Sequence, residues 1–186
     1  GCIWINNTLV PLGNFMWGNE DSDTMTGGGD PDFIWGNDAD DSIQGDAGND
    51  FLWGDAGKDT MQGGVGRDLL WGNGDDDVLN GDAGTDFLWG NDGADTMYGG
   101  VGQDLLWGNG EDDILNGDGG ADFIWGNYGA DLLHGDGGID LLWGNDGGDS
   151  LFGDDGTDLL WGNSGDDQLQ GGAATDFLGG NEGGES

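Results

Sequence analysis

Apolar and polar positions alternate along this chain with a strict period of nine residues. From Gly18 to Gly179 the sequence divides, without insertion or deletion, into eighteen nonapeptides, such as Gly90–Tyr98 and Gly99–Trp107. Each nonapeptide begins with six polar, glycine-rich residues, which predict a turn. It ends with three residues centred on an apolar one, which predict a short strand. Such a short, fixed period indicates a solenoid, in which each coil contacts only its neighbours.

Two nonapeptides make one coil, because tryptophan recurs at every eighteenth residue. The members of this ladder are Trp17, Trp35, Trp53, Trp71, Trp89, Trp107, Trp125, Trp143 and Trp161. We therefore expect an all-β fold, a parallel β-roll (β-solenoid) of about nine coils whose strands stack into two parallel sheets. Along the chain we expect an N-terminal cap or docking segment (1–17), the roll (18–179) and a partial repeat or C-terminal tail (180–186).

The eighth position of every nonapeptide is apolar, for example Leu106 and Met97. Strand side chains alternate between faces, so the eighth position is expected to point into the roll and the seventh and ninth positions outward. Such a core is one side chain deep per strand. Two buried side chains per coil are too few to offset the conformational entropy of ordering eighteen residues. Another interaction must stabilise each coil.

Glycine and asparagine occupy fixed places in the turns. The first position is glycine in all eighteen nonapeptides, and the fourth is usually glycine, which suggests positive φ angles at both. Asparagine, which tolerates left-handed geometry, follows the glycine after almost every tryptophan strand. Six fourth positions depart from glycine, and we expect distorted turns or weaker ion binding there: Asp21, Asp30, Ala39, Asp75, Glu111 and Ala174.

Aspartate occupies the sixth position of every nonapeptide. One predicted edge of the roll carries Asp32, Asp50, Asp68, Asp86, Asp104, Asp122, Asp140, Asp158 and Asp176. The other edge carries Asp23, Asp41, Asp59, Asp77, Asp95, Asp113, Asp131, Asp149 and Asp167. Carboxylates stacked one coil apart, at about 4.8 Å, would repel by roughly 3 kcal/mol per neighbouring pair at an effective dielectric near 20. Columns of this kind predict a counter-ion in each gap.

The overall charge also indicates divalent cations as partners. The 186 residues carry a net charge of -37, and the only bases are Lys58 and Arg67, which excludes nucleic acid as a partner and disfavours anionic membranes. No apolar run approaches the roughly twenty residues of a transmembrane helix. Cys2 is the only cysteine, so no intrachain disulfide is possible.

Calcium is the cation that these ligands favour. Hard carboxylate and carbonyl oxygens in flexible turns suit Ca²⁺, which accepts six to eight oxygens in irregular geometry, whereas Mg²⁺ demands a stricter octahedron. Zinc prefers histidine or thiolate, and His134 and Cys2 cannot supply a repeated site. Nine aspartates per edge leave eight gaps, so the two edges predict about sixteen Ca²⁺ ions, whose charge would offset most of the -37.

The nonapeptides resemble a known family of repeats. Their pattern G-G-x-G-x-D-x-U-x, with U a large apolar residue, is similar to the RTX (repeats-in-toxin, haemolysin-type) calcium-binding repeats and covers Gly18 to Gly179. The resemblance implies a parallel β-roll with calcium held in the turn stacks by aspartate carboxylates and turn carbonyls. It also implies bacterial secretion, to the extracellular space or cell surface, and folding when the chain meets extracellular calcium.

Calcium does not account for the tryptophan ladder. On the same sheet the seventh position is Phe33, Phe51, Phe87, Phe123 and Phe177, or leucine, and both positions are expected to face outward. The opposite sheet carries mainly threonine, serine, glutamine and asparagine there and is an ordinary wetted surface, although Ile114, Leu132 and Phe152 make it less polar toward the C-terminus. Ring stacking within the sheet is one explanation of the ladder. Its outer surface would still exceed the apolar area that monomers usually expose, so we favour a partner.

We expect no enzyme, because no HExxH, G-x-S-x-G or Cys-His arrangement is present and His134 sits on the polar face. The leading hypothesis is a secreted, calcium-folded structural protein that self-associates through its Trp/Phe/Leu face into fibres, a sheath or a matrix. A homo-oligomer would form by face-to-face packing, and docking of one end on the next subunit would give a filament. The alternatives are an adhesin module for polysaccharide or a cell surface, and an excerpt of a larger RTX protein.

Overall fold

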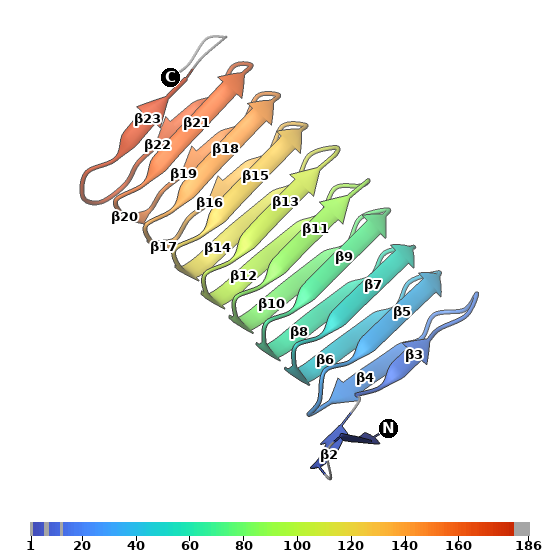
Figure 1. Cartoon of the computed structure of the whole chain (residues 1–186). Coiled ribbons are helices and arrows are strands. Elements are labelled where there is room, and N and C mark those ends of the chain that lie inside the picture. The colour runs from blue at the N-terminus through green and yellow to red at the C-terminus, as the bar shows by residue number, and fades with distance from the viewer. Residues whose placement is uncertain (1, 6–7, 12, 181–186) are drawn as a thin grey trace.

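The protein is an all-strand parallel β-roll, seen in a computed structural model that describes residues 2–5, 8–11 and 13–180 (Figure 1). The chain winds through coils of eighteen residues, and successive coils stack along one axis from β3 and β4 to β22 and β23. Each complete coil contributes to both of two facing sheets. The predicted fold class is therefore confirmed.

The first sheet contains the tryptophan ladder and is called the tryptophan sheet below. Its strands are β3 (Phe15–Trp17), β5 (Phe33–Asp38), β7 (Phe51–Ala56), β9 (Leu69–Gly74), β11 (Phe87–Asn91), β13 (Leu105–Asn109), β15 (Phe123–Tyr128), β18 (Leu141–Asp146), β21 (Leu159–Ser164) and β23 (Phe177–Gly179), which pair in this order. All its pairs are parallel, and Trp53 lies opposite Trp35 and Trp71. The register between coils therefore follows the sequence period without a slip.

The second sheet is called the polar sheet. Its strands are β4 (Thr24–Gly28), β6 (Ser42–Gly48), β8 (Thr60–Gly66), β10 (Val78–Gly84), β12 (Thr96–Gly102), β14 (Ile114–Gly120), β16 (Leu132–His134), β17 (Gly137–Gly138), β19 (Ser150–Phe152), β20 (Asp155–Gly156) and β22 (Gln168–Gln170). The strands from β4 to β14 are unbroken, whereas the next two coils each contain two short strands, β16 with β17 and β19 with β20. This interruption starts next to His134.

The strands of most inner coils are longer than the three residues that the sequence predicts. The inner strands β6, β8, β10, β12 and β14 each span seven residues and run into the turn that follows. Turn residues of successive coils also pair in parallel, for example Ala83 with Val101. The turns therefore stack as regularly as the strands.

The eighth positions form the core, as predicted. Sixteen apolar side chains, from Met25 to Leu160, are buried and form one continuous cluster between the sheets. The seventh and ninth positions on both sides of each buried residue are at least partly exposed, as in β11. At the last described coil Leu178 is 49% exposed, because no further described coil covers it.

The reason for glycine at the first position differs from the expectation. Positive φ angles occur at the second position, as at Asn91 (φ 81°), and at many fourth positions, as at Gly102 (φ 155°), but not at the first. A Cβ on the first-position Gly90 would lie 2.1 Å from Asp95 Oδ2. Space beside the carboxylate, rather than backbone conformation, therefore requires glycine there.

Four of the six fourth positions that lack glycine keep the positive φ of this turn, whereas Asp21 and Asp30 do not. Ala39, Asp75, Glu111 and Ala174 adopt positive φ angles between 66° and 82°. These turns are thus strained, but the backbone path continues.

The N-terminal residues form a separate hairpin. Strands β1 (Cys2–Ile5) and β2 (Thr8–Pro11) pair antiparallel in a sheet of their own, which lies beyond β3 and β4 (Figure 1). The tryptophan sheet begins at Phe15, within the segment 1–17 expected to be a cap. Most of the expected tail 180–186 lies outside the described residues. Nowhere in the described parts of the chain is there a helix that is long and apolar enough to cross a membrane.

Candidate metal centre

The sixth-position aspartates form two columns, one along each turn edge of the roll. They are named the Asp32 column and the Asp23 column after their first members, with the residues given above. Sixteen of the eighteen side chains are buried, with exposed fractions of 3% or less. Each aspartate is held inward because the strand begins at the next residue and the turn backbone folds over it, as at Asp95 before β12. The turns therefore bring together the residues that the sequence predicts.

One carboxylate oxygen of each aspartate is used to join neighbouring coils. The backbone N–H of Asp77 donates to Oδ1 of Asp95 at 2.8 Å, and the N–H of Asp95 donates to Oδ1 of Asp113 at 2.8 Å. The same bond recurs along both columns, from Asp23 N–H to Asp41 and from Asp32 N–H to Asp50, both at 2.7 Å. Sequence reasoning missed this ladder, because it assigned the carboxylates wholly to the counter-ion.

The other oxygen of each buried aspartate has no partner. Oδ2 is buried without a hydrogen bond in all sixteen buried members of the columns, including Asp95 and Asp104. Each Oδ2 faces the space that the first-position glycine leaves open. A Cβ on Gly36 would lie 2.2 Å from Asp41 Oδ2 and 2.7 Å from the carbonyl oxygen of Gly54 in the next coil. Carboxylate and carbonyl oxygens thus converge where a side chain would otherwise be.

Burial makes these carboxylates costly to ionise in the absence of a cation. Desolvation, followed by repulsion from neighbouring aspartates in the column, raises the pKa of Asp77, Asp113 and Asp122 to about 8. Burial raises the pKa of Asp95 to about 7 against the opposing hydrogen bond from Asp77. A buried carboxylate must therefore either take up a proton or face a positive charge.

The ends of the columns differ from the middle. Asp23 and Asp176 are partly exposed, and Asp23 Oδ2 accepts hydrogen bonds from the backbone and side chain of Asn19. At the start of the Asp32 column, Asn14 lies one coil before Asp32. Its N–H donates to Asp32 Oδ1, and its amide Nδ2 donates to the carbonyl of Gly27 at 2.9 Å. Asn14 therefore continues the column with a neutral side chain. Its sequence signal, an eighteen-residue offset from Asp32, was not used in the prediction.

The donor set fits calcium. A row of unpartnered carboxylate oxygens, each beside glycine carbonyls in a turn, offers only hard oxygen ligands, which Ca²⁺ prefers. The columns contain no imidazole or thiolate of the kind that Zn²⁺ selects. The ions would be held by the aspartates of successive coils and by first-position glycine carbonyls, and would supply the charge that the buried carboxylates need.

The family comparison agrees with this reading of the turns. The family model of the RTX calcium-binding nonapeptide repeat, which spans four copies, matches eight overlapping windows: 17–52, 35–70, 53–88, 71–106, 89–124, 107–142, 125–160 and 143–178. Together these windows cover nearly all of the roll. The chain belongs to the RTX family. Its repeats are thus calcium-binding repeats, and the predicted family and cofactor class are confirmed. A comparison with curated proteins gives no match.

In this RTX roll, His134 has a more defined place than the sequence suggests. It was expected to be an ordinary surface residue of the polar face. Its ring is instead only partly exposed, stacks on Phe152 with 4.7 Å between ring centroids, and is hydrogen-bonded to Asp154. A further aspartate column at the second position, which includes Asp136 and Asp154, was also overlooked. His134 and this second-position column lie outside the Asp23 column and the Asp32 column.

Proposed function

We propose that this RTX roll is a secreted structural protein that folds on calcium and self-associates through its tryptophan sheet. About sixteen Ca²⁺ ions, one in each gap of the two aspartate columns, would hold the roll. The observation that carries the self-association is the continuous outer surface of the tryptophan sheet. Three features of this surface support self-association: the stacking of the indoles, the difference between the two faces of the roll, and the area of the strip.

First, the indoles form an unbroken stack. Neighbouring rings from Trp17 to Trp161 lie 4.6 to 5.2 Å apart between centroids and within 8° of parallel. Apart from Trp17 at the end, every ladder ring is partly exposed, because its neighbours cover its two faces and leave its outer edge. Ring stacking within the sheet, one of the explanations given above, thus accounts for part of the tryptophan ladder. The outer edges still form one flat apolar strip.

Second, the two faces of the roll differ. Beside the indoles runs a column of phenylalanine and leucine, and Phe15 stacks on Phe33 at 4.9 Å. The polar sheet instead exposes residues such as Ser42, Gln44 and Gln62. The polar sheet also exposes Val65, Val78, Val101 and Ile114, and it becomes less polar toward the C-terminus, where Ile114 pairs with Leu132. On the tryptophan sheet, by contrast, the apolar column continues from coil to coil, for example through Trp71, Trp89 and Trp107.

Third, the strip is large enough for a weak interface. Eight steps of about 4.8 Å give a length of about 38 Å, and two outward positions on each strand give a width of roughly 13 Å. Two copies packed face to face would bury about 1,000 Å² in total, near the lower limit of specific interfaces. A second copy matches this surface in length and flatness, because both strips have the same coil spacing.

The calcium requirement supports secretion. RTX repeats are typical of extracellular proteins, and a roll held by many oxygen-ligated ions needs the higher calcium concentrations found outside cells. In this proposal the chain is exported without a fold, folds on contact with calcium and then assembles into fibres, a sheath or a matrix.

The experiment compares the wild type with two double variants by sedimentation velocity, with calcium and after its removal. Trp89→Thr with Trp107→Thr breaks the middle of the strip, whereas Tyr98→Thr with Asn116→Thr makes the matched change on the polar sheet. Circular dichroism during a calcium titration checks that each variant folds. We expect concentration-dependent assemblies of the wild type and the polar-sheet variant in calcium, and monomers of the tryptophan variant.

A wild type that stays monomeric in calcium at the highest accessible concentration would refute self-association. Retention of that monomer on insoluble glycans would assign the strip to surface binding instead. If both double variants assemble equally well, the tryptophan sheet is not the interface.

A further inference from the structure

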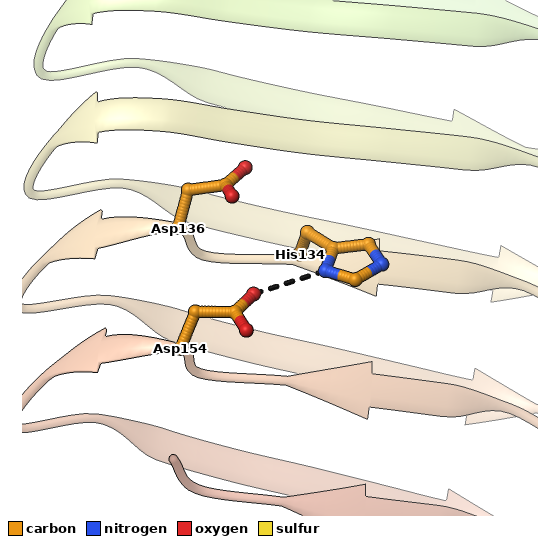
Figure 2. A group of neighbouring side chains, drawn as sticks. All are labelled: His134, Asp136 and Asp154. Atoms are coloured by element: carbon orange, nitrogen blue, oxygen red, sulfur yellow. Dashed lines mark hydrogen bonds and ion pairs between the residues drawn. The ribbon is translucent and has the colours of Figure 1, made fainter. Parts of the chain in front are cut away.

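The only histidine of the chain lies within a cluster of two carboxylates on the polar sheet. Figure 2 shows the imidazole of His134 beside Asp136 of its own coil and Asp154 of the next coil. Its Nδ1 is hydrogen-bonded to the Asp154 carboxylate. This bond measures 2.9 Å, and one ligand atom from each of the three residues lies within 4.8 Å of the others. The ring is fixed by its parallel contact with Phe152, at 4.7 Å and 9°.

The cluster coincides with a break in the sequence pattern. At the second position of this turn edge, aspartate and glycine alternate from Gly28 through Asp46 and Gly64 to Asp118, but Asp136 and Asp154 then follow Asp118 directly. Where aspartate alternates with glycine, strands such as β10 continue through the turn. At Asp136 and Asp154 the strands are interrupted. Consecutive aspartates are thus placed next to the histidine, in the two coils whose polar-sheet strands are interrupted.

Space for further ligands lies next to the two carboxylates. An open recess of about 560 Å³ adjoins them, lined by Asp136, Gly137, Asp154, Asp155, Gly172 and Ala173. Because Gly172 takes the place of a third aspartate in the next coil, the recess stays open to solvent. Water molecules there can complete the coordination shell of a cation.

We propose that His134, Asp136 and Asp154 form a binding site for one divalent transition-metal cation of the zinc type, separate from the calcium columns. One imidazole and two carboxylates make three protein ligands, and solvent takes the open position, an arrangement common for Zn²⁺. Ca²⁺ selects oxygen ligands and gains nothing from the imidazole. The bound cation would join two neighbouring coils and offset the charge of the two consecutive aspartates.

The test uses Co²⁺ as a visible-absorbing probe added to the full chain in excess calcium, which keeps the aspartate columns filled. His134→Gln and Asp136→Gly each remove one ligand, and the chain itself carries glutamine and glycine at the equivalent places Gln44 and Gly64. Asp46→Gly makes the same change in a coil without histidine. We expect one equivalent of Co²⁺ with imidazole-ligand absorption in the wild type and in Asp46→Gly, and release of the Co²⁺ by Zn²⁺.

Each ligand variant should weaken Co²⁺ binding at least about tenfold. Calcium titrations followed by circular dichroism confirm that the variants fold. Three results would overturn the proposal. They are no Co²⁺ binding by the folded wild type, Co²⁺ binding that disappears when the calcium concentration is raised further, and equal Co²⁺ binding by His134→Gln. The last two would assign the Co²⁺ to the calcium columns or to scattered carboxylates.

Discussion

Replacement of Asp95 by asparagine tests the role of one carboxylate oxygen, Oδ2, which is expected to face the metal ion. Asp95 is 1% exposed, its Oδ1 accepts the N–H of Asp77, and its Oδ2 is buried without a partner. Asparagine keeps a carbonyl oxygen for the Asp77 N–H but turns the second oxygen into an amide donor. Asn14 takes the equivalent place at the exposed end of the other column, where its amide donates to a glycine carbonyl. The variant should therefore keep the fold and lose only charge and a ligand oxygen.

The expected effect has opposite signs with and without calcium. Asp95 borders two gaps of its column, those toward Asp77 and Asp113. At a free calcium concentration 100 times the dissociation constant, each bound ion stabilises the fold by about 2.7 kcal/mol, so losing one or two ions costs about 3–5 kcal/mol. Without calcium, the pKa of Asp95 is about 7 and that of Asp77 and Asp113 about 8, so only above that pH does removing the Asp95 carboxylate relieve repulsion, by roughly 3 kcal/mol per ionised neighbour.

The measurement is a calcium titration followed by far-ultraviolet circular dichroism, with bound calcium counted by elemental analysis after dialysis. Asp92→Asn is the matched control, because Asp92 lies in the same turn, is exposed and carries the same charge. We expect Asp95→Asn to bind one or two fewer ions and to need more calcium to fold. Asp92→Asn should behave as the wild type.

Equal shifts of the calcium midpoint in the two variants would refute the reasoning, because they would show that only net charge matters. An unchanged ion count in Asp95→Asn would show that its Oδ2 is not a ligand.

Two further predictions concern pH and backbone space. Burial raises the pKa of Asp77, Asp86, Asp113 and Asp122 to about 8 in the metal-free roll, above about 3.9 for unfolded aspartate, so these groups stabilise that state fully below about pH 4 and the contribution is lost as the pH rises through 8. Circular dichroism of metal-stripped protein should therefore show more β structure at pH 5 than at pH 8, and the opposite trend would contradict the burial of these carboxylates. In calcium, Gly102→Ala should lower the unfolding temperature strongly, because φ is 155° and the new Cβ would lie 1.5 Å from the Gly84 carbonyl oxygen, whereas Gly119→Ala, with its nearest contact at 3.9 Å, should leave it nearly unchanged. Equal unfolding temperatures would show that the fourth positions are less crowded than the structure indicates.

The architecture could be predicted from the sequence because its signals repeat. A single apolar residue in one nonapeptide says little, but an apolar eighth position in all of them fixes which face is buried, as Leu106 and Met97 confirm. The eighteen-residue spacing of tryptophan likewise fixes the register, which places Trp89 opposite Trp107. The alignment of the aspartates into two columns follows from the same periodicity.

The remaining features depend on geometry that a repeat pattern does not encode. Nothing in the spacing of Asp77 and Asp95 indicates that a backbone N–H of one coil uses Oδ1 of the next. Glycine at the first position was correctly expected, but for a conformational reason, whereas the close approach of Asp95 Oδ2 to Gly90 is the structural cause. His134 occurs once, so periodicity carries no information about it, and only the three-dimensional contact with Asp154 reveals its surroundings.

The ladder of Oδ1 bonds also explains why the columns suit a cation. Because the N–H of Asp113 fixes Oδ1 of Asp131 at 2.8 Å, the remaining oxygen is aimed before any ion binds, and little side-chain entropy is left to lose. This N–H belongs to the aspartate of the preceding coil, so each carboxylate is oriented only when that coil is in register. Ion binding and coil stacking therefore stabilise each other step by step along the roll. Asn14 begins one column with a neutral amide in the aspartate's place, so this end of the stack needs no cation to neutralise its first member.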